Sequence, residues 1–498
     1  MKHILTLDQG TTSSRAIVYN EQLGTLASAQ KEFPQYFPQP GWVEHDASEI
    51  WATVLETARE AILKSGVSAA DIASIGITNQ RETIVVWDRR SGEPAYRAIV
   101  WQDRRTGEYI SALREAGKEA LIQQRTGLLL DPYFSASKLH WILRQIPDGH
   151  ARAAGGELAA GTVDSWMIFK LTGGREHVTD VSNASRTMLM NVRTGEWDPE
   201  LLALFDIPAA VLPRIVSSSG VFGVSDASFF GGELTVGSAI GDQQAALFGQ
   251  LCTKPGLVKC TYGTGCFLLT FTGPDAISSA NRLLTTVAWR IGKEPMQYAI
   301  EGSVFMGGAS IQWLRDGLGI IKSAPEVNEL AARAADSGGV VLVPAFTGLG
   351  APYWDPSARG ALLGLSRGTT SAHIARATLE GIAYQVADLI GAMEKDSGRK
   401  ISILRVDGGA CASDLLMQTQ ADLLGLPVER PKNIESTALG AAMLAGLGAG
   451  IWPDVESLSS IREVDRKFAP TITVKDRRAR MKVWKKAVRR AQNWETPL

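Results

Sequence analysis

The stretch Ile4-Leu5-Thr6-Leu7-Asp8-Gln9-Gly10-Thr11-Thr12-Ser13-Ser14-Arg15 precedes a second apolar run at residues 16–19. Two short apolar segments around a Gly-Thr turn predict a β-hairpin. Gly10 lets the backbone approach an anion closely, and the N–H groups and hydroxyls of the turn can donate to phosphate oxygens. Asp8, where the first strand ends, can hold a hydrated Mg²⁺ ion. Taken alone, the stretch is equally compatible with an ordinary polar turn, because Gly and Thr occur in many hairpins.

A second copy of this pattern lies about half a chain later. Residues 259–262 lead into Gly263-Thr264-Gly265 and then into an apolar run at 266–271. A chain of 498 residues is too long for one comfortable core and suits two domains. We therefore expect a duplicated nucleotide-binding fold, with domains at residues 1–250 and 251–498 and the nucleotide in the cleft between them.

The composition limits the classes of function. A formal net charge of -1 and a pI of about 6.6 argue against a general nucleic-acid binder. A hydrophobic content of 45% with 50 glycines fits a large α/β enzyme that has many strand-to-helix turns. The four cysteines form no C-x-x-C pair, and neither a secretory signal nor a membrane-spanning run is evident. We expect a cytoplasmic protein without stable membrane association.

Three further apolar strands end in polar or glycine-rich turns. The turns are Asn79-Gln80-Arg81-Glu82, Gly241-Asp242-Gln243-Gln244 and Asp407-Gly408-Gly409-Ala410. Because α/β sheets bind ligands at the carboxyl ends of their strands, we expect Asp8 and Asp242 to face one cleft. The double glycine, followed by a helix that begins near Ser413, suits the nucleoside and α-phosphate of a nucleotide.

Several phosphate-binding classes are disfavoured by missing motifs. The chain contains no G-x-x-x-x-G-K-[ST] stretch, which argues against a P-loop enzyme, and no H-R-D or D-F-G, which argues against a protein kinase. No G-x-G-x-x-G follows the first strand, so a Rossmann dehydrogenase is also disfavoured.

Taken together, the turns at residues 8–12, 241–244, 262–265 and 407–409 resemble those of the actin/hexokinase ATPase fold as FGGY carbohydrate kinases use it. Residues 133–141 are similar to the first FGGY signature, and residues 408–424 are similar to the second. Further segments resemble the branch of the family that phosphorylates glycerol: Trp42-Val43-Glu44-His45-Asp46, Thr78-Asn79-Gln80-Arg81-Glu82-Thr83, Asp131-Pro132-Tyr133-Phe134, Asn183-Ala184-Ser185-Arg186-Thr187-Met188-Leu189 and Ala351-Pro352-Tyr353-Trp354-Asp355-Pro356. The resemblance covers nearly the whole chain.

This resemblance implies an α/β fold of two duplicated ribonuclease H-like domains with a catalytic cleft between them. It also implies ATP- and Mg²⁺-dependent phosphorylation of glycerol to sn-glycerol 3-phosphate. The residues implied to bind the triol are Arg81, Glu82, Trp101, Tyr133, Asp242, Gln243 and Phe267. A small polyol needs charged partners for its hydroxyls and aromatic faces for its C–H edge, which agrees with these residue types.

Asp242 is implied to be the general base that accepts the proton of the attacking hydroxyl. The residues alone leave simpler interpretations open. Asp242 is also compatible with a helix N-cap, Arg81 and Glu82 with a surface ion pair, and the aromatic residues with core packing.

The resemblance assigns the nucleotide to both halves of the chain. Asp8 is implied to hold Mg²⁺, and the nucleotide is implied to contact Thr11, Thr12, Ser13, Arg15, Thr264, Gly308, Gln312, Gly409 and Ser413. Gly308 and Gln312 are one helical turn apart and can share a face, although Gly308 also suits a tight packing contact. The family pattern has Asn where this chain has Ser413, and Ser reaches less far.

Two other functions stay open from the sequence. One is an FGGY kinase acting on xylulose, erythritol or dihydroxyacetone, and the other is a non-catalytic actin-fold protein. Arg81, Glu82 and Trp101 favour glycerol, and Asp242 favours catalysis. By the resemblance we expect a homodimer or homotetramer. Residues 229–234 lack the Arg that some members carry for a sugar-bisphosphate effector.

Overall fold

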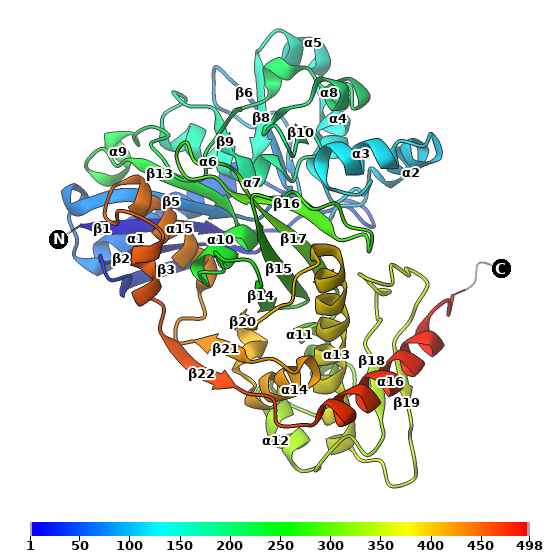
Figure 1. The fold of residues 1–498 in the computed structure, drawn as a ribbon. Helices are drawn as coiled ribbons and strands as arrows, with labels where there is room; N and C mark the ends of the chain where they lie inside the picture. The colour runs from blue at the N-terminus through cyan, green and yellow to red at the C-terminus, as the bar shows by residue number, and fades with distance from the viewer. Residues whose placement is uncertain (1, 496–498) are drawn as a thin grey trace.

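Two β-sheets that share a common order over five strands dominate the computed structural model, which describes residues 2–495 (Figure 1). The first sheet has the order β13-β5-β1-β2-β3. Its strands are β1 His3–Gln9, β2 Ser13–Tyr19, β3 Thr25–Glu32, β5 Ile72–Asn79 and β13 Val236–Gly241. Strands β1, β2 and β3 form an antiparallel meander, whereas β5 and β13 run parallel to β1.

The second sheet repeats this arrangement in the order β16-β17-β15-β14-β20-β21-β22. Its strands are β14 Leu257–Tyr262, β15 Cys266–Gly273, β16 Leu284–Trp289, β17 Gln297–Val304, β20 Ile403–Asp407, β21 Val428–Pro431 and β22 Val464–Phe468. Strands β14, β15 and β17 form the meander, and β20 and β21 run parallel to β14. The predicted duplication is therefore confirmed, and the two Gly-Thr turns occupy equivalent positions between the first two strands of each sheet.

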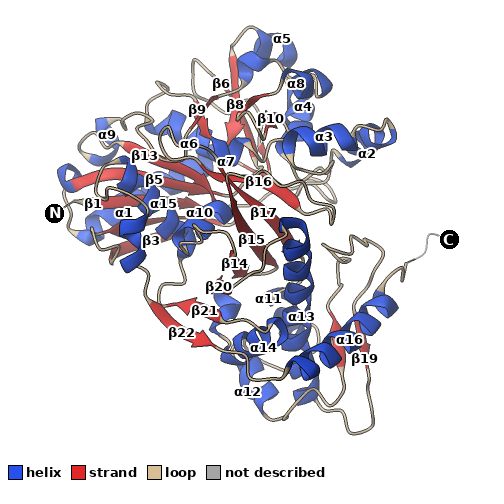
Figure 2. Cartoon of the chain, in the orientation of Figure 1, coloured by secondary structure: helices blue, strands red, loops and turns tan. Residues whose placement is uncertain are grey.

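Helices flank both sheets (Figure 2). Helix α1, Ala47–Ser65, packs against β2 and β3 through a stripe that includes Ile50, Val54, Ala58 and Ala61. Its start is fixed because the Asp46 side chain accepts a hydrogen bond from Ser48 N, and its end is fixed by a left-handed glycine. In the second half, the long helix α13, Ser371–Ser397, packs against β17 and against helices that include α12 Glu326–Ala332 and α14 Asp414–Leu424.

One helix of the second half of the sequence covers the sheet of the first half. Helix α15, Ser436–Gly448, contacts β1, β5 and β13, and it crosses α10, Asp242–Gly249. The crossing is close, since a Cβ atom on Gly440 would lie 1.9 Å from the carbonyl oxygen of Ala245. The boundary between residues 250 and 251 therefore does not separate all packing contacts, and the two-domain division stays a prediction.

The remaining elements extend the first half above its sheet and complete the second half below (Figure 1). In the first half they are β4 Glu44–His45, β6 Ile84–Asp88, β7 Ala98–Ile99, α2 Gly107–Glu115, α3 Glu119–Thr126, α4 Ser135–Gln145, α5 Gly149–Ala154, β8 Leu158–Thr162, α6 Val163–Leu171, β9 Val178–Asp180, α7 Val181–Ala184, β10 Met190–Asn191, β11 Glu196–Trp197, α8 Pro199–Leu204, β12 Arg214–Val216 and α9 Ala227–Phe230. In the second half they are α11 Gly308–Asp316, β18 Val341–Val343, β19 Ala361–Leu363 and α16 Val474–Ala491.

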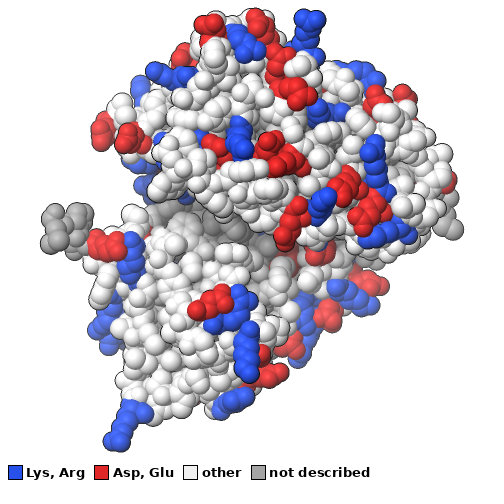
Figure 3. All heavy atoms as spheres, turned by 180° about the vertical axis from the view of Figure 1, so that it is seen from behind, with Lys and Arg blue, Asp and Glu red and all other residues white. Residues whose placement is uncertain are grey.

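The surface seen from behind is hollowed between the upper and lower parts of the molecule (Figure 3). Basic and acidic side chains are interspersed over this face, in keeping with the small net charge. Within residues 2–495, no helix combines the length and the apolar character that crossing a membrane requires.

Candidate active site

The carboxyl ends of three parallel strands in the first sheet lie side by side. Gln9 at the end of β1 pairs with Asn79 at the end of β5, and Asn79 pairs on its other side with Gly241 at the end of β13. Asp8 directly precedes Gln9 and Asp242 directly follows Gly241. The strand register therefore places both carboxylates at one edge of the sheet, as the strand order predicts.

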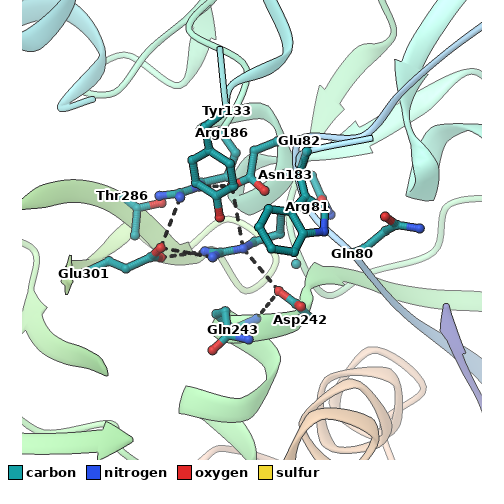
Figure 4. Close-up of polar contacts among 12 residues, drawn as sticks. Gln80, Arg81, Glu82, Tyr133, Asn183, Arg186, Asp242, Gln243, Thr286 and Glu301 are labelled. Carbon is teal, nitrogen blue, oxygen red and sulfur yellow. Dashed lines mark hydrogen bonds and ion pairs between the residues drawn. The ribbon is translucent and has the colours of Figure 1, made fainter. Parts of the chain in front are cut away.

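Arg81 lies at the centre of this row of strand ends, in the turn after β5 (Figure 4). Its Nη1 and Nη2 atoms donate to Glu301 Oε2 and Oε1 over 2.6 and 3.0 Å. Its Nε atom lies 3.1 Å from Asp242 Oδ1. Because Glu301 belongs to β17 of the second sheet, Arg81 joins the two halves of the chain through a bidentate ion pair.

A second arginine completes the charge cluster. Arg186 Nε donates to Glu82 Oε1 over 2.6 Å, and Arg186 Nη2 donates to Glu301 Oε1 over 3.1 Å. The side chains of Arg81, Glu82, Arg186 and Glu301 are each no more than 2% exposed. Such burial is tolerable because two positive and two negative groups are paired and hydrogen-bonded.

The environment sets the pKa values of the carboxyl groups. Burial raises the pKa of Asp242 above its ordinary value, and the charges of Arg81 and Lys259 only partly offset this effect. Burial also acts to raise the pKa of Glu301, but Arg186 and Arg81 hold it down at about 2. Glu301 is thus a fixed negative charge, whereas Asp242 is a carboxylate whose basicity is enhanced.

Lys259 is a buried cation beside the predicted base. Its Nζ atom donates to Gln243 Oε1 over 2.5 Å and to Thr261 Oγ1 over 2.6 Å. Burial lowers the pKa of Lys259. The contact occupies the carbonyl oxygen of Gln243 and leaves its amide N–H groups as the side that can donate to a ligand.

Three residues of this cluster, Glu301, Arg186 and Lys259, were not identified as functional from the sequence. Glu301 and Lys259 are lone charges within otherwise apolar strands, and a charge at such a position is rarely buried without a partner. A lone charge within an apolar strand could therefore have identified Glu301 and Lys259 from the sequence. Arg186 lies in a segment whose resemblance was noted, but its partner Glu82 is 104 residues away and no local pattern connects the two.

Two predicted aromatic residues form a wall next to the cluster. The rings of Trp101 and Tyr133 meet edge to face, with centroids 5.6 Å apart. Trp101 Nε1 also donates to Thr11 Oγ1 over 3.0 Å, which connects this wall to the first Gly-Thr turn. Lys138 Nζ donates to the carbonyl oxygen of Tyr133. Phe267 is half-buried on β15, opposite Ser303.

The first Gly-Thr turn carries a mixture of exposed and paired groups. Thr12 is exposed, while Thr11 and Ser13 are half-buried. Arg15 Nη2 lies 2.7 Å from Asp8 Oδ2 and 2.6 Å from Glu435 Oε2. The guanidinium of Arg15 is therefore held by carboxylates from both halves of the chain, and its contact with phosphate stays a prediction.

The donor set at this turn is compatible with Mg²⁺ that arrives with a nucleotide. Proteins usually bind such a Mg²⁺ ion through one or two carboxylates, and phosphates and waters supply the other ligands. Within the described residues, no three or more His, Cys, Asp or Glu side chains group as a metal cage. Asp8 can supply the carboxylate that this mode of binding requires, and its contact with Mg²⁺ stays a prediction.

The second Gly-Thr turn is bonded directly to the start of α11. The carbonyl oxygen of Gly263 accepts from Gly308 N over 2.8 Å, and that of Thr264 accepts from Gly307 N over 2.8 Å and from Ala309 N over 3.1 Å. A Cβ atom on Gly308 would lie 2.8 Å from Gly263 O, so close packing is present at this glycine. The side chains of Thr264 and Gln312 are exposed.

The double glycine lies beside this turn. Gly408 has a φ of +82°, and a Cβ atom there would lie 2.8 Å from Tyr262 O, so only glycine suits the position. Gly409 is exposed. Ser413 begins α14 as its N-cap, accepting from Leu416 N over 3.1 Å, and its hydroxyl also donates to Asn328 Oδ1 on α12.

The duplicated sheets, with a Gly-Thr turn on each and a buried charge cluster between them, define a class of kinase for small hydroxylated acceptors. The family model described as the N-terminal domain of the FGGY family of carbohydrate kinases matches residues 3–249, and the C-terminal model matches residues 258–449. The chain belongs to the FGGY family of carbohydrate kinases.

Curated relatives and solved structures agree with this assignment. A glycerol kinase of Trichlorobacter lovleyi is 58% identical over 100% of both chains, and one of Deinococcus radiodurans is 54% identical over 99% of this chain and 98% of that protein. The structure of Plasmodium falciparum glycerol kinase with ADP has a TM-score of 0.94 at 36% identity, covering 99% of this chain and 98% of that one. A Lactobacillus acidophilus xylulose kinase, with a TM-score of 0.88 at 23% identity over 98% and 97% of the two chains, shares the fold.

Proposed function

We propose that this protein transfers the γ-phosphoryl group of ATP to a terminal hydroxyl of glycerol, giving sn-glycerol 3-phosphate and ADP in glycerol catabolism. The observation that carries the proposal is the placement of Asp242 beside Arg81, at the strand edge that also bears the first Gly-Thr turn. Full-length similarity to curated glycerol kinases supports the choice of acceptor.

The charge cluster can bind a triol through its hydroxyls. Arg81 donates to a hydroxyl oxygen, Glu82 accepts from a hydroxyl proton, and the amide of Gln243 adds a donor. The edge-to-face pair of Trp101 and Tyr133 offers an apolar face to the carbon backbone. A shorter or less polar acceptor would leave hydrogen-bonding groups of this pocket without a ligand partner, which makes the pocket selective.

Asp242 accepts the proton as the terminal hydroxyl attacks the γ-phosphorus. The raised pKa of Asp242 makes it a stronger base than an exposed aspartate. The oxygen–phosphorus bond to the acceptor forms while the bond to the β-γ bridging oxygen breaks, and ADP leaves with that electron pair. The fixed pairing of Arg81 keeps the acceptor aligned for this in-line transfer.

The phosphates occupy the space between the two Gly-Thr turns. Thr11, Thr12 and Ser13 donate from one side, and Thr264 donates from the other. Mg²⁺ held by Asp8 supplies neutralisation of the β- and γ-phosphate charge when it is bound. Arg15 can contribute once it exchanges one of its carboxylate partners for phosphate.

The test is ADP release by the purified protein with Mg-ATP and glycerol, dihydroxyacetone, erythritol or xylulose, against a control without acceptor. Strong release that requires both glycerol and Mg²⁺ is expected. ADP release only with a larger polyol or a ketose would leave the proposed phosphate-binding residues in place and would contradict glycerol as the acceptor. ADP release at the same rate with and without each acceptor would contradict phosphoryl transfer to these acceptors.

We also propose that the protein works in the cytoplasm as a homodimer or homotetramer. Family resemblance is the support for both statements. Light scattering after size-exclusion chromatography gives the mass of the assembly, and a mass of one chain across micromolar concentrations would contradict the proposal.

A further inference from the structure

A pocket of about 610 Å³ opens between helices α12 and α14, beyond the double glycine. Four of its lining residues are alanines, Ala332, Ala334, Ala335 and Ala412. Such short side chains leave a slot with apolar walls, and its polar groups come from neighbouring positions. The pocket adjoins the turn Gly409–Ala412, which is where the proposed nucleotide passes from phosphate to nucleoside.

The hydroxyl of Ser413 is already committed within the protein. Its oxygen accepts from Leu416 N as the cap of α14, and its proton is donated to Asn328 Oδ1. Ser413 therefore cannot donate to a nucleotide without giving up its bond to Asn328. The carboxamide that contacts Ser413 belongs to Asn328 on α12.

Asn328 keeps unused hydrogen-bonding capacity at the pocket wall. Its Nδ2 atom donates to Pro325 O over 3.2 Å, which uses one of two hydrogens, and its Oδ1 atom accepts from Ser413, which uses one of two lone pairs. One donor and one acceptor remain on a single carboxamide. Ser413 and Pro325 fix the orientation of that carboxamide before a ligand arrives.

We propose that Asn328 recognises the adenine base of ATP in this pocket and sets the preference for ATP over GTP. The inference rests on the proposed function, because it assumes that the nucleotide lies along Gly409. A carboxamide matches adenine, which presents an N–H donor beside a ring-nitrogen acceptor, whereas guanine presents a carbonyl acceptor where adenine has its amino group. The planar guanidinium of Arg376 in the same wall can stack on the base.

The experiment compares Asn328→Ala with the matched control Glu329→Ala, an exposed neighbour on the same helix that does not line the pocket. For each protein, kcat and KM are measured with ATP and with GTP at saturating glycerol. Asn328→Ala should lower the ratio of kcat/KM for ATP over GTP by about 10-fold to 100-fold, the value of one bidentate base contact. The change should lie in KM for ATP, while kcat and the control stay unchanged.

Two further variants separate this role from a merely structural one. Ser413→Ala keeps the Asn328 carboxamide and should change the ATP-to-GTP ratio less than Asn328→Ala does. The exchange Asn328→Ser with Ser413→Asn returns an amide to the pocket from the opposite wall and should recover part of the preference. A larger loss in Ser413→Ala, or no recovery in the exchange, would contradict the inference.

Calorimetric titration of ADP and GDP keeps the inference distinct from the proposed function. If glycerol-dependent turnover is absent but Asn328→Ala still weakens ADP binding relative to GDP, the proposed function fails and the base contact stands. If turnover is present and the ADP-to-GDP ratio is unchanged by Asn328→Ala, the proposed function stands and the base contact is wrong.

Discussion

The acceptor side and the nucleotide side of the cleft are formed by different kinds of chemical group. On the acceptor side, Arg81, Glu82, Arg186 and Glu301 are buried and paired with one another before any ligand arrives. On the nucleotide side, the structure offers glycine backbone, exposed hydroxyls and a pocket lined with alanines. On the acceptor side, the charged groups are therefore already oriented when the protein folds. On the nucleotide side, binding relies on close approach of the backbone to the nucleotide.

This contrast separates the kinetic consequences of substitution. Changes to the paired charges alter the alignment of reacting groups and should reduce kcat or kcat/KM for glycerol. Changes to the glycine and hydroxyl side remove contacts that persist through the reaction and should mainly raise KM for ATP. The predictions below test whether the two sides behave differently in this way.

The largest effect is expected from Asp242→Asn, which keeps the size of the side chain and removes the base. We expect kcat to fall roughly 100- to 10,000-fold, the usual contribution of a positioned general base. Coupled-enzyme assays measure kcat, and thermal unfolding verifies the fold. The exposed control Glu233→Gln should keep normal turnover. Near-normal turnover in Asp242→Asn would remove Asp242 from the chemistry.

A smaller effect is expected from Glu301→Gln, which breaks the clamp on Arg81 and leaves Asp242 in place. The freed guanidinium should turn toward Asp242, so kcat/KM for glycerol should fall roughly 10- to 100-fold through misalignment. The free energy of unfolding should fall by about 3–5 kcal/mol, because a buried ion pair loses one partner. The exposed Glu294→Gln is the control.

The pH profile distinguishes this role from general destabilisation. Asp242 acts only when ionised, so the rate should fall as pH drops through its pKa, which burial raises above the ordinary value. The charge of Glu301 adds to that rise. In Glu301→Gln the acid limb of kcat should therefore move to lower pH. An unmoved limb would limit Glu301 to a structural role.

Much of the fold could be predicted from the sequence because its signals are local. Each Gly-Thr turn follows an apolar strand within a few residues, and each strand-end turn is bounded by its own apolar run. The strand register then brings Asp8 and Asp242 to the same edge, since parallel strands of one sheet end together. The repetition of this pattern predicted the duplication.

The charge cluster could be predicted only in part because its contacts are long-range. Arg81 and Glu301 are 220 residues apart; Arg81 follows β5 of the first sheet, and Glu301 lies on β17 of the second. Nothing near Arg81 in the sequence indicates that its partner lies on β17. Likewise, the expected nucleotide contact at Ser413 could not reveal Asn328, which is 85 residues distant and on another helix.

On the nucleotide side, Gly308→Ala should have a moderate effect. The added Cβ atom would lie 2.8 Å from Gly263 O, so the second Gly-Thr turn or the start of α11 must shift. Overpacking of this kind costs about 1–3 kcal/mol, and we expect KM for ATP to rise roughly tenfold with little change in kcat. Gly391→Ala, which meets no atom within 4 Å, is the matched control. A loss in kcat alone would contradict the division between the two sides.

The smallest effect on activity is expected at a buried carboxyl pair that no cation neutralises within the described residues. Asp164 accepts from Thr179 Oγ1, and burial together with the neighbouring Asp180 raises the pKa of Asp164 to about 7. The folded state therefore holds a proton that the unfolded chain releases at lower pH. The Asp164 carboxyl should make the free energy of unfolding fall as pH rises from the ordinary aspartate pKa of 3.8 toward about 7. Above that pH, its effect on the free energy of unfolding should be constant. Urea unfolding between pH 5 and 8 should show that the free energy of unfolding depends less on pH in Asp164→Asn than in the parent protein, while kcat stays unchanged. An identical pH dependence in the two proteins would contradict the prediction.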